Sequence, residues 1–340
     1  MMMNISQNTL AILLLTAPLL FNHFERSQEI LTPREYKKLA RYLRDNKKQP
    51  ADLLAVNADR LIEDIGKFLA IERIKKLLNR GFLLSQVIDK WQARSIWVIS
   101  RADDEYPNRL KERLKDDSPA ILYGCGEASV MNTGGLAVVG SRHIDTDTIK
   151  YTEIVGCLAA SAGITIVSGA ARGVDQAAMR GALEHGGKVT GVMADSLERA
   201  SVERLNRDFL QDKRLVLISP YDPASGFNVG NAMQRNKLIY ALAEASLVVS
   251  SDYNNGGTWA GAVEQLDKLH YVPVYVRVSE NSGKGLRALK DKGAFAWPEP
   301  ATHEALSKIL ADKPYYTKER LQEALPLTIS EQPERYDKGF

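Results

Sequence analysis

The sequence predicts an α/β protein with an extended Rossmann-like, doubly wound and mostly parallel sheet, preceded by a small all-helical domain. From residue 136, short unbroken apolar runs alternate with helical stretches, which indicates a parallel sheet covered on both faces. Before residue 96 the pattern is helical only. The 340 residues suit two domains, and 44% hydrophobic with 26% charged residues excludes a disordered, collagen-like or membrane-bundle chain.

The helical domain is expected over residues 1–95. Its apolar run 10–21 is too short, at about a dozen residues, to cross a bilayer, and no Lys or Arg precedes it as in a signal peptide. We therefore expect a buried helix in a cytoplasmic protein. Thr32, Pro33 and Glu35 form a helix start. Three more helical stretches are expected at 52–56, 59–69 and 71–78, and Gly81 is expected to end the last of them.

The Rossmann-like core is expected over residues 96–290, followed by a short helical tail over 291–340. Two short strands at its start, 96–99 and 121–123, flank a helix at 109–114. The core strands are predicted at 136–139, 164–167, 188–193, 215–218, 247–249 and 271–278. The helices between them are predicted at 147–161, 175–185, 198–211, 232–244 and 258–269, and those of the tail at 302–310 and 318–325. Right-handed crossovers then give the doubly wound sheet.

The net charge of +3 hides an uneven distribution. Residues 31–100 carry 15 Lys/Arg against 8 Asp/Glu, whereas residues 131–340 carry 24 against 25. A polyanionic partner would therefore bind either the basic helical domain or a few individual Lys and Arg side chains in the core. The two cysteines, Cys125 and Cys157, predict neither a disulfide framework nor a metal cluster.

Ligands of open parallel sheets bind beyond the carboxyl ends of the strands, so the turns there are the candidate site. The first core strand is followed by Gly140, Ser141 and Arg142, and the second by residues 168–175. Small residues let the backbone approach a phosphate, and N–H groups at a helix start donate to it. Arg142 and Arg172 would add charge and two-pronged hydrogen bonding. Tight turn geometry alone is the other interpretation of these glycines.

Two later segments complete the candidate site. In 227–237, Arg235 and Lys237 lie near a helix start, where the helix dipole disfavours cations, which suggests that they hold an anion. The loop 250–262 is rich in small residues and opens a helix at Thr258, an N-cap or phosphate donor. Trp259 would stack on a base or pack under the loop. Neither the dinucleotide fingerprint nor a Walker A loop is present, so we expect no NAD and no ATPase activity. We also expect no other cofactor and no metal.

Four motifs together resemble the DNA-processing protein A (DprA, also called Smf) family. They are G-S-R at 140–142, S-G-x-A-x-G-x-D at 168–175, F…R-N-K ending at 235–237, and G-G-T at 256–258. The resemblance implies a SAM-like helical domain, a homodimer, and single-stranded DNA bound in a basic pocket of the core. It also implies loading of the recombinase RecA during natural transformation, and no membrane. The expected DNA or phosphate contacts are Gly140, Ser141, Arg142, Ser168, Gly169, Arg172, Asp175, Arg235, Asn236, Lys237, Gly256, Gly257 and Thr258.

The chain also departs from the family pattern. Met179 stands where a His is common, Lys237 replaces the third residue of R-N-R, and residues 194–198 replace a Gly-x-x-x-Tyr-Pro segment. The loop between Phe227 and Arg235 is longer, and residues after 290 are too few for a winged helix. These differences suggest a divergent member.

Two alternatives to DNA binding remain at this point. Met233, Arg235, Lys237 and the loop 256–264 are loosely similar to the M-x-x-R-K and G-G-x-G-T-x-x-E motifs of cytokinin-activating phosphoribohydrolases. Such an enzyme would use Glu264 at the ribose and Arg235 on the phosphate. A nucleotide sensor in stress or phage defence is the other alternative. We expect a protein that is not an enzyme.

Overall fold

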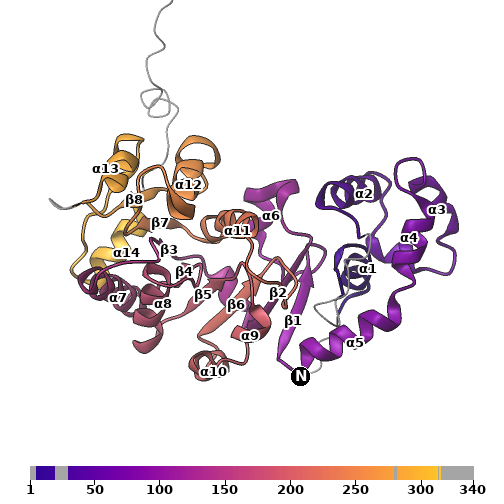
Figure 1. Ribbon diagram of the computed structural model, residues 1–340, viewed down its shortest axis with the longest axis horizontal. Coiled ribbons are helices and arrows are strands. Elements are labelled where there is room, and N and C mark those ends of the chain that lie inside the picture. Colours follow the sequence, from indigo (N-terminus) through magenta and orange to yellow (C-terminus); the bar gives the residue numbers. More distant parts are fainter. Residues whose placement is uncertain (1–4, 20–29, 279–281, 313, 315–340) are drawn as a thin grey trace, which may run out of the picture.

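The computed structural model describes residues 5–19, 30–278, 282–312 and 314 (Figure 1). Within these residues a nine-stranded sheet has the order β1-β2-β6-β5-β4-β3-β7-β8-β9. The pairs β1–β2 and β2–β6 are antiparallel, and all later pairs are parallel. The strands are β1 Ile96–Ser100, β2 Ile121–Gly126, β3 Leu136–Val139, β4 Ile166–Ser168, β5 Val189–Val192, β6 Leu215–Ser219, β7 Ala245–Val248, β8 Val274–Val276 and β9 Phe295–Ala296. The predicted fold class is confirmed.

Helices cover both faces of the sheet. The helices that follow β1 in the sequence are α6 Asn108–Leu114, α7 Thr146–Ser161, α8 Val174–Glu184, α9 Leu197–Ala200, α10 Arg204–Gln211, α11 Val229–Leu242, α12 Gly256–Glu264, α13 Lys284–Asp291 and α14 His303–Ala311. Short 3-10 turns lie at Lys115–Asp117 and Ala128–Asn132, and a π-helical turn, Gln265–Leu269, continues α12. One apolar cluster joins the sheet to α7, α8 and α14, and a second joins it to α6, α11, α12 and α13.

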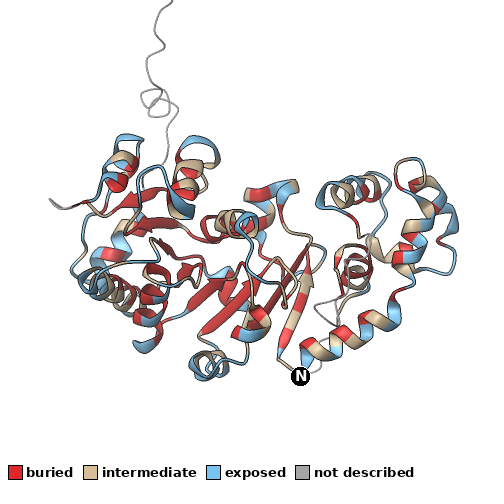
Figure 2. Cartoon of the chain, viewed as in Figure 1, coloured by how far each residue is buried: buried red, intermediate tan, exposed pale blue. Residues whose placement is uncertain are grey.

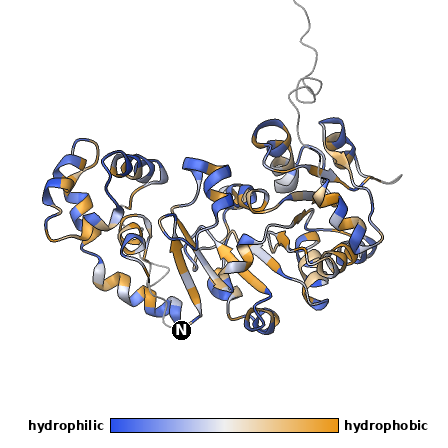
Figure 3. Ribbon diagram, turned by 180° about the vertical axis from the view of Figure 1, so that it is seen from behind, coloured by the Kyte–Doolittle hydropathy of each residue, from blue (hydrophilic) through white to orange (hydrophobic). Residues whose placement is uncertain are grey.

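Successive side chains along a strand point to opposite faces of the sheet, so each strand contributes residues to both clusters. In β3, Leu136 and Val138 belong to the first cluster, whereas Ala137 and Val139 belong to the second. All four are buried, which is why the strand reads as an unbroken apolar run. Figure 2 shows the same burial across the central strands, and Figure 3 shows that these strands are hydrophobic.

The helical region before β1 has its own core but is not separate from the sheet. Its elements are α1 Gln7–Thr16, α2 Pro33–Asp45, the 3-10 turn Pro50–Leu54, α3 Asp59–Ile65, α4 Ile71–Leu78 and α5 Gly81–Gln92. Leu15 of α1 packs in the helical core with Leu39 and Ile74, while Ile12 belongs to the sheet cluster with Ile96. Residues 10–16 of the apolar run therefore lie in a buried helix, as its composition predicts. No helix in the described residues is long and apolar enough to cross a membrane.

The capping box that opens α2 is formed as its sequence predicts. The side-chain oxygen of Thr32 accepts from the N–H of Glu35, and the Glu35 carboxylate accepts from the N–H of Thr32. Arg73 pairs with Glu35 at 2.7 Å. Together with the Thr32 hydrogen bonds, this pairing lowers the pKa of Glu35 to about 2.

Several elements differ from the prediction. Gly81 does not end α4, which stops at Leu78; it begins α5, a helix that the pattern missed. Leu84, Val87 and Trp91 bury α5 in the sheet cluster, so tertiary packing outweighs the helix-ending tendency of glycine there. The predicted helix 198–211 is broken into α9 and α10.

The region after residue 290 also differs, because it adds a strand to the sheet. Strand β9 pairs with β8, and the ring of Phe295 lies 5.7 Å from that of Tyr275. Helix α13 was not predicted, whereas the helix opening at Thr302 is α14. The predicted helix 318–325 lies outside the described residues.

Candidate nucleic-acid interface

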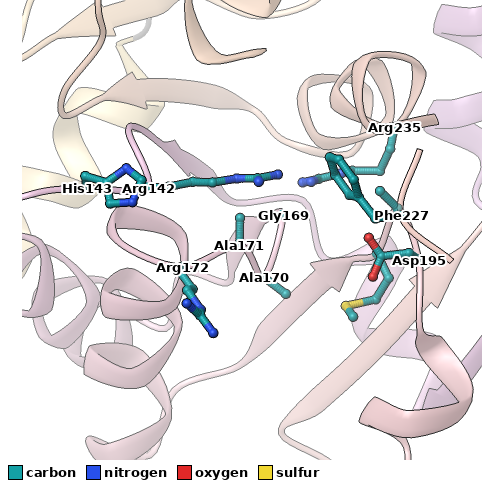
Figure 4. Close-up of a pocket in the computed structure, with 11 residues that line it drawn as sticks. Arg142, His143, Gly169, Ala170, Ala171, Arg172, Asp195, Phe227 and Arg235 are labelled. Carbon is teal, nitrogen blue, oxygen red and sulfur yellow. The ribbon is translucent and has the colours of Figure 1, made fainter. Parts of the chain in front are cut away.

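A hollow lies over the carboxyl ends of the parallel strands. We call it the sheet-edge cavity; its volume is about 370 Å³. The loops after β3, β4 and β5 and the segment that opens α11 supply its walls (Figure 4). Its lining residues are Arg142, His143, Gly169, Ala170, Ala171, Arg172, Met193, Ala194, Asp195, Phe227 and Arg235. The cavity is therefore built where an open parallel sheet places its ligand.

Two arginines from distant segments meet in this cavity. Figure 4 shows the guanidinium groups of Arg142 and Arg235 pointing toward one another. Arg235 is only 6% exposed, whereas Arg142 is exposed and lies over the ring of Phe227, 5.2 Å from its centre. Two facing guanidiniums repel one another, so an anion between them is strongly favoured, and a phosphate matches their hydrogen-bonding geometry.

A buried carboxylate holds Arg235 in place. Oδ2 of Asp175 lies 4.0 Å from Nη1 of Arg235 and accepts a 3.4 Å hydrogen bond from the N–H of Ala171. Burial raises the pKa of Asp175 to about 6, and Arg235 acts in the opposite direction. Burial also lowers the pKa of Arg235, which Asp175 and Asp195 raise. A buried carboxylate with a pKa raised to about 6 therefore lies behind the cavity wall, next to Arg235.

Gly169 is required by this arrangement. A Cβ on Gly169 would lie 1.5 Å from Nη1 of Arg235 and 2.6 Å from Oδ2 of Asp175. The glycine thus leaves room for the buried ion pair directly above the turn that follows β4. Gly140 has a different reason, because a Cβ there would strike Val174 at 2.4 Å. Close packing of α8 on β3 explains that glycine.

Several predicted contacts lie outside the cavity. Ser168 is fully buried and donates to the carbonyl of Val138 at 2.6 Å, so it links two strands. The N–H of Ser141 donates to Oγ of Ser250 at 3.0 Å. The Thr258 hydroxyl donates to the carbonyl of Gly140 at 2.9 Å. The Ser141 N–H and the Thr258 hydroxyl thus join the loops after β3 and β7, and these two donors and the Ser168 hydroxyl donate within the fold.

Lys237 and Arg235 are separated by the helix that carries them. Positions two apart on an α-helix point in nearly opposite directions. Lys237 pairs with Glu264 at 3.1 Å in a second hollow of about 590 Å³ between α11 and α12, which Gly256 also lines. Asn236 donates to the carbonyl of Gly257 at 3.1 Å. The predicted cluster 235–237 and loop 256–258 therefore do not form one site with Arg142.

The same separation bears on the phosphoribohydrolase alternative. That chemistry needs Arg235 and Glu264 on one substrate, but Arg235 lines the sheet-edge cavity and Glu264 lines the second hollow. No group of three or more His, Cys, Asp or Glu that could hold a metal ion occurs among the described residues. The geometry thus favours an anion-binding site.

The match to known proteins agrees with this geometry. The model of the DNA recombination-mediator protein A family matches residues 97–305. The chain belongs to this family. The match covers every residue that lines the sheet-edge cavity and all of the sheet except Ile96, the first residue of β1.

Individual family members are distant relatives. DNA processing protein DprA of Streptococcus pneumoniae is 27% identical over 203 residues, which are 59% of this chain and 71% of that protein. Protein Smf of Escherichia coli is 30% identical over 242 residues, which are 66% of this chain and 62% of that protein. The alignment thus spans less than two thirds of the Escherichia coli protein.

Two solved family structures have the same fold. The Streptococcus pneumoniae DprA structure superposes with a TM-score of 0.66 at 20% identity, covering 92% of this chain and 100% of that chain. DprA of Helicobacter pylori, whose structure was described for its unique single-stranded DNA binding mode, gives a TM-score of 0.51 at 22% identity. That comparison covers 65% of this chain and 97% of the Helicobacter pylori chain.

Sequence reasoning missed part of the cavity wall. In the sequence, Asp195 is marked only as part of a departure from the family pattern, and Phe227 only as part of a motif. Asp195 lines the cavity because β5 ends at Val192 and places the following residues at the sheet edge, a position that strand prediction alone supplies. Phe227 is 56% exposed beside Arg142, and the signal that the sequence offers for it is an aromatic residue in the segment that leads to Arg235.

Proposed function

We propose that this DprA-family protein binds single-stranded DNA at the sheet-edge cavity and acts in DNA processing and recombination. The observation that carries the proposal is the pair of facing guanidiniums, Arg142 and Arg235, beside the exposed ring of Phe227. Proteins that bind single strands combine cations that hold the phosphates with aromatic rings that stack on the bases. The two arginines and Phe227 provide this combination. A duplex keeps its bases paired and offers none to Phe227.

A binding titration tests this proposal. Labelled single strands and duplexes of equal length would be titrated at several salt concentrations, with binding followed by fluorescence anisotropy. We expect tighter binding of the single strand at moderate salt, and log affinity that falls by about 0.7 per log salt for each phosphate neutralised. Equal binding of duplex and single strand would contradict the proposal.

The wider role is also part of the proposal. We propose a cytoplasmic homodimer that passes single strands to a RecA-type recombinase during recombination or natural transformation. Membership of the family supports this role. We propose that the protein does this without catalysing a reaction of its own. The separation of Arg235 and Glu264 in different hollows argues against phosphoribohydrolase chemistry in particular. Light scattering would give the oligomeric state, and incubation with nucleoside monophosphates would reveal any release of free base.

Gly169→Ala is expected to reduce binding without unfolding the protein. The new methyl group would displace the side-chain ends of Arg235 and Asp175, and no backbone atom is among its three nearest contacts, so the backbone need not move. We expect about tenfold weaker binding of single strands, comparable to the loss of one charged hydrogen bond. Anisotropy and a thermal melt measure the two quantities. Gly81→Ala is the control, because no atom lies within 4 Å of the added carbon and the position has no positive φ.

Binding is expected to strengthen as the pH falls from about 7.5 to 5.5, because Asp175 has a pKa of about 6. Protonation removes one negative charge beside Arg235, and a bound polyanion favours the protonated form. The strands should be oligothymidine, which takes up no proton in this range. Asp175→Asn is expected to bind more tightly at the higher pH and to flatten the profile. His143 lines the same cavity, so the pH dependence of binding is also measured in His143→Gln, which distinguishes an effect of this residue from that of Asp175. An unchanged pH profile in Asp175→Asn would contradict the assignment.

A further inference from the structure

An acidic side chain stands in a cavity that otherwise presents arginines. Asp195 is the only carboxylate among the residues that line the sheet-edge cavity within the described chain. Figure 4 shows its carboxylate on the same side of the cavity as Phe227 and Arg235, while Arg172 and His143 lie on the other side. A carboxylate here weakens the binding of any phosphate chain, so its position needs another explanation.

The Asp195 carboxylate has both oxygens available. Within the described part of the chain, no side chain or backbone group hydrogen-bonds to it, and no cation lies within ion-pair distance. Its neighbours Ser196 and Glu198 are fixed by backbone hydrogen bonds from their N–H groups to Ser225 and Pro223, at 2.9 Å each. The carboxylate is therefore a free hydrogen-bond acceptor on a loop that backbone hydrogen bonds fix in place. Asp175 differs, because it is buried against Arg235.

We propose that Asp195 makes the sheet-edge cavity selective for guanine within a single strand. In this arrangement a phosphate lies between Arg142 and Arg235, the base stacks on the exposed ring of Phe227, and the Watson–Crick edge of the base faces Asp195. Guanine presents two adjacent donors on that edge, N1–H and the N2 amino group, which match the two oxygens of a carboxylate. Proteins read unpaired bases in this way, by stacking on aromatic rings and hydrogen bonds to the Watson–Crick edge.

The other bases fit this acceptor less well. Adenine and cytosine offer one exocyclic amino group beside a ring acceptor. Thymine offers one ring N–H between two carbonyl oxygens, which repel the carboxylate. The proposal rests on the proposed function, because it assigns a base preference to the same cavity.

The experiment compares thymidine strands that carry isolated guanines with the same strands carrying adenine, cytosine, hypoxanthine or 7-deazaguanine at those positions. Hypoxanthine lacks the N2 amino group, and 7-deazaguanine keeps the whole Watson–Crick edge. We expect guanine and 7-deazaguanine strands to bind at least about fivefold more tightly than all-thymidine strands, with hypoxanthine in between. Competition against a labelled oligothymidine, followed by anisotropy, measures the order.

Variants assign the preference to the residue. Asp195→Ala is expected to bind oligothymidine more tightly than the unmodified protein and to lose the guanine preference. Asp208→Ala makes the same charge change on the exposed face of α10 and is expected to keep the preference. Equal binding of all strands by the unmodified protein, or a guanine preference that survives in Asp195→Ala, would overturn this inference and leave DNA binding intact. Failure to bind any single strand would overturn the proposed function and this inference with it.

Discussion

Arg142→Ala combined with Arg235→Gln is expected to weaken single-strand binding at least about a hundredfold. Each guanidinium makes charge-assisted hydrogen bonds to phosphate, and such bonds are worth about 1.5 to 3 kcal/mol each. Because phosphate contacts carry no base information, the loss is expected for every sequence alike. The slope of log affinity against log salt is expected to become shallower by about 0.7, for the one phosphate that lies between the two guanidiniums and is no longer neutralised.

The two single variants separate the roles of the arginines. Arg142 is exposed, so Arg142→Ala is expected to change binding and leave the melting temperature unaltered. Arg235 is buried against Asp175, so Arg235→Gln leaves that carboxylate without its cation and is expected to lower stability as well. Arg204→Ala is the matched control, because Arg204 is an exposed arginine on α10 that lines neither hollow. Equal weakening by Arg204→Ala would show that net charge alone matters.

Arg80→Met is expected to lower the free energy of unfolding by about 3 kcal/mol. Arg80 is buried at the carboxyl end of α1, where its Nη2 donates to the carbonyls of Leu14 and, at 3.0 Å, Ala17. Methionine would keep most of the packing of the side-chain stem but leave these carbonyls without donors. Because α1 belongs to both the helical core and the sheet cluster, both regions are expected to loosen.

Urea unfolding followed by circular dichroism measures this effect. Arg204→Met, on the exposed face of α10, is expected to change stability by less than about 0.5 kcal/mol. A change that small for Arg80→Met would show that water or backbone rearrangement satisfies the carbonyls of α1 equally well. The position of Arg80 at the end of α1 would then not contribute to joining the two regions.

The sheet could be predicted from the sequence because each core strand is buried on both faces. Strand β3 appears as four consecutive apolar residues, and the helices between strands have apolar faces that match. Strand β9 escaped prediction because two residues at the sheet's edge carry too little pattern, and its place depends on the contact of Phe295 with Tyr275.

The candidate site could be predicted only in part. The sequence locates the loops at the carboxyl ends of strands, but it does not show which side chains on them converge. The hydroxyls of Ser168 and Thr258 and the backbone N–H of Ser141 are suitable polar groups, yet hydrogen bonds within the fold use them. Arg235 and Lys237 are neighbours in the motif, yet the turn of the helix places them in different hollows. Convergence of this kind is a property of tertiary structure.

The location of the bound strand is the most direct test of the account. Hydrogen–deuterium exchange of the protein with and without single-stranded DNA measures it across the chain. We expect slower exchange in residues 141–143, 169–172 and 226–235, which line or flank the sheet-edge cavity. Protection confined to the basic helical region, residues 31–95, with no change in these three segments, would contradict the account.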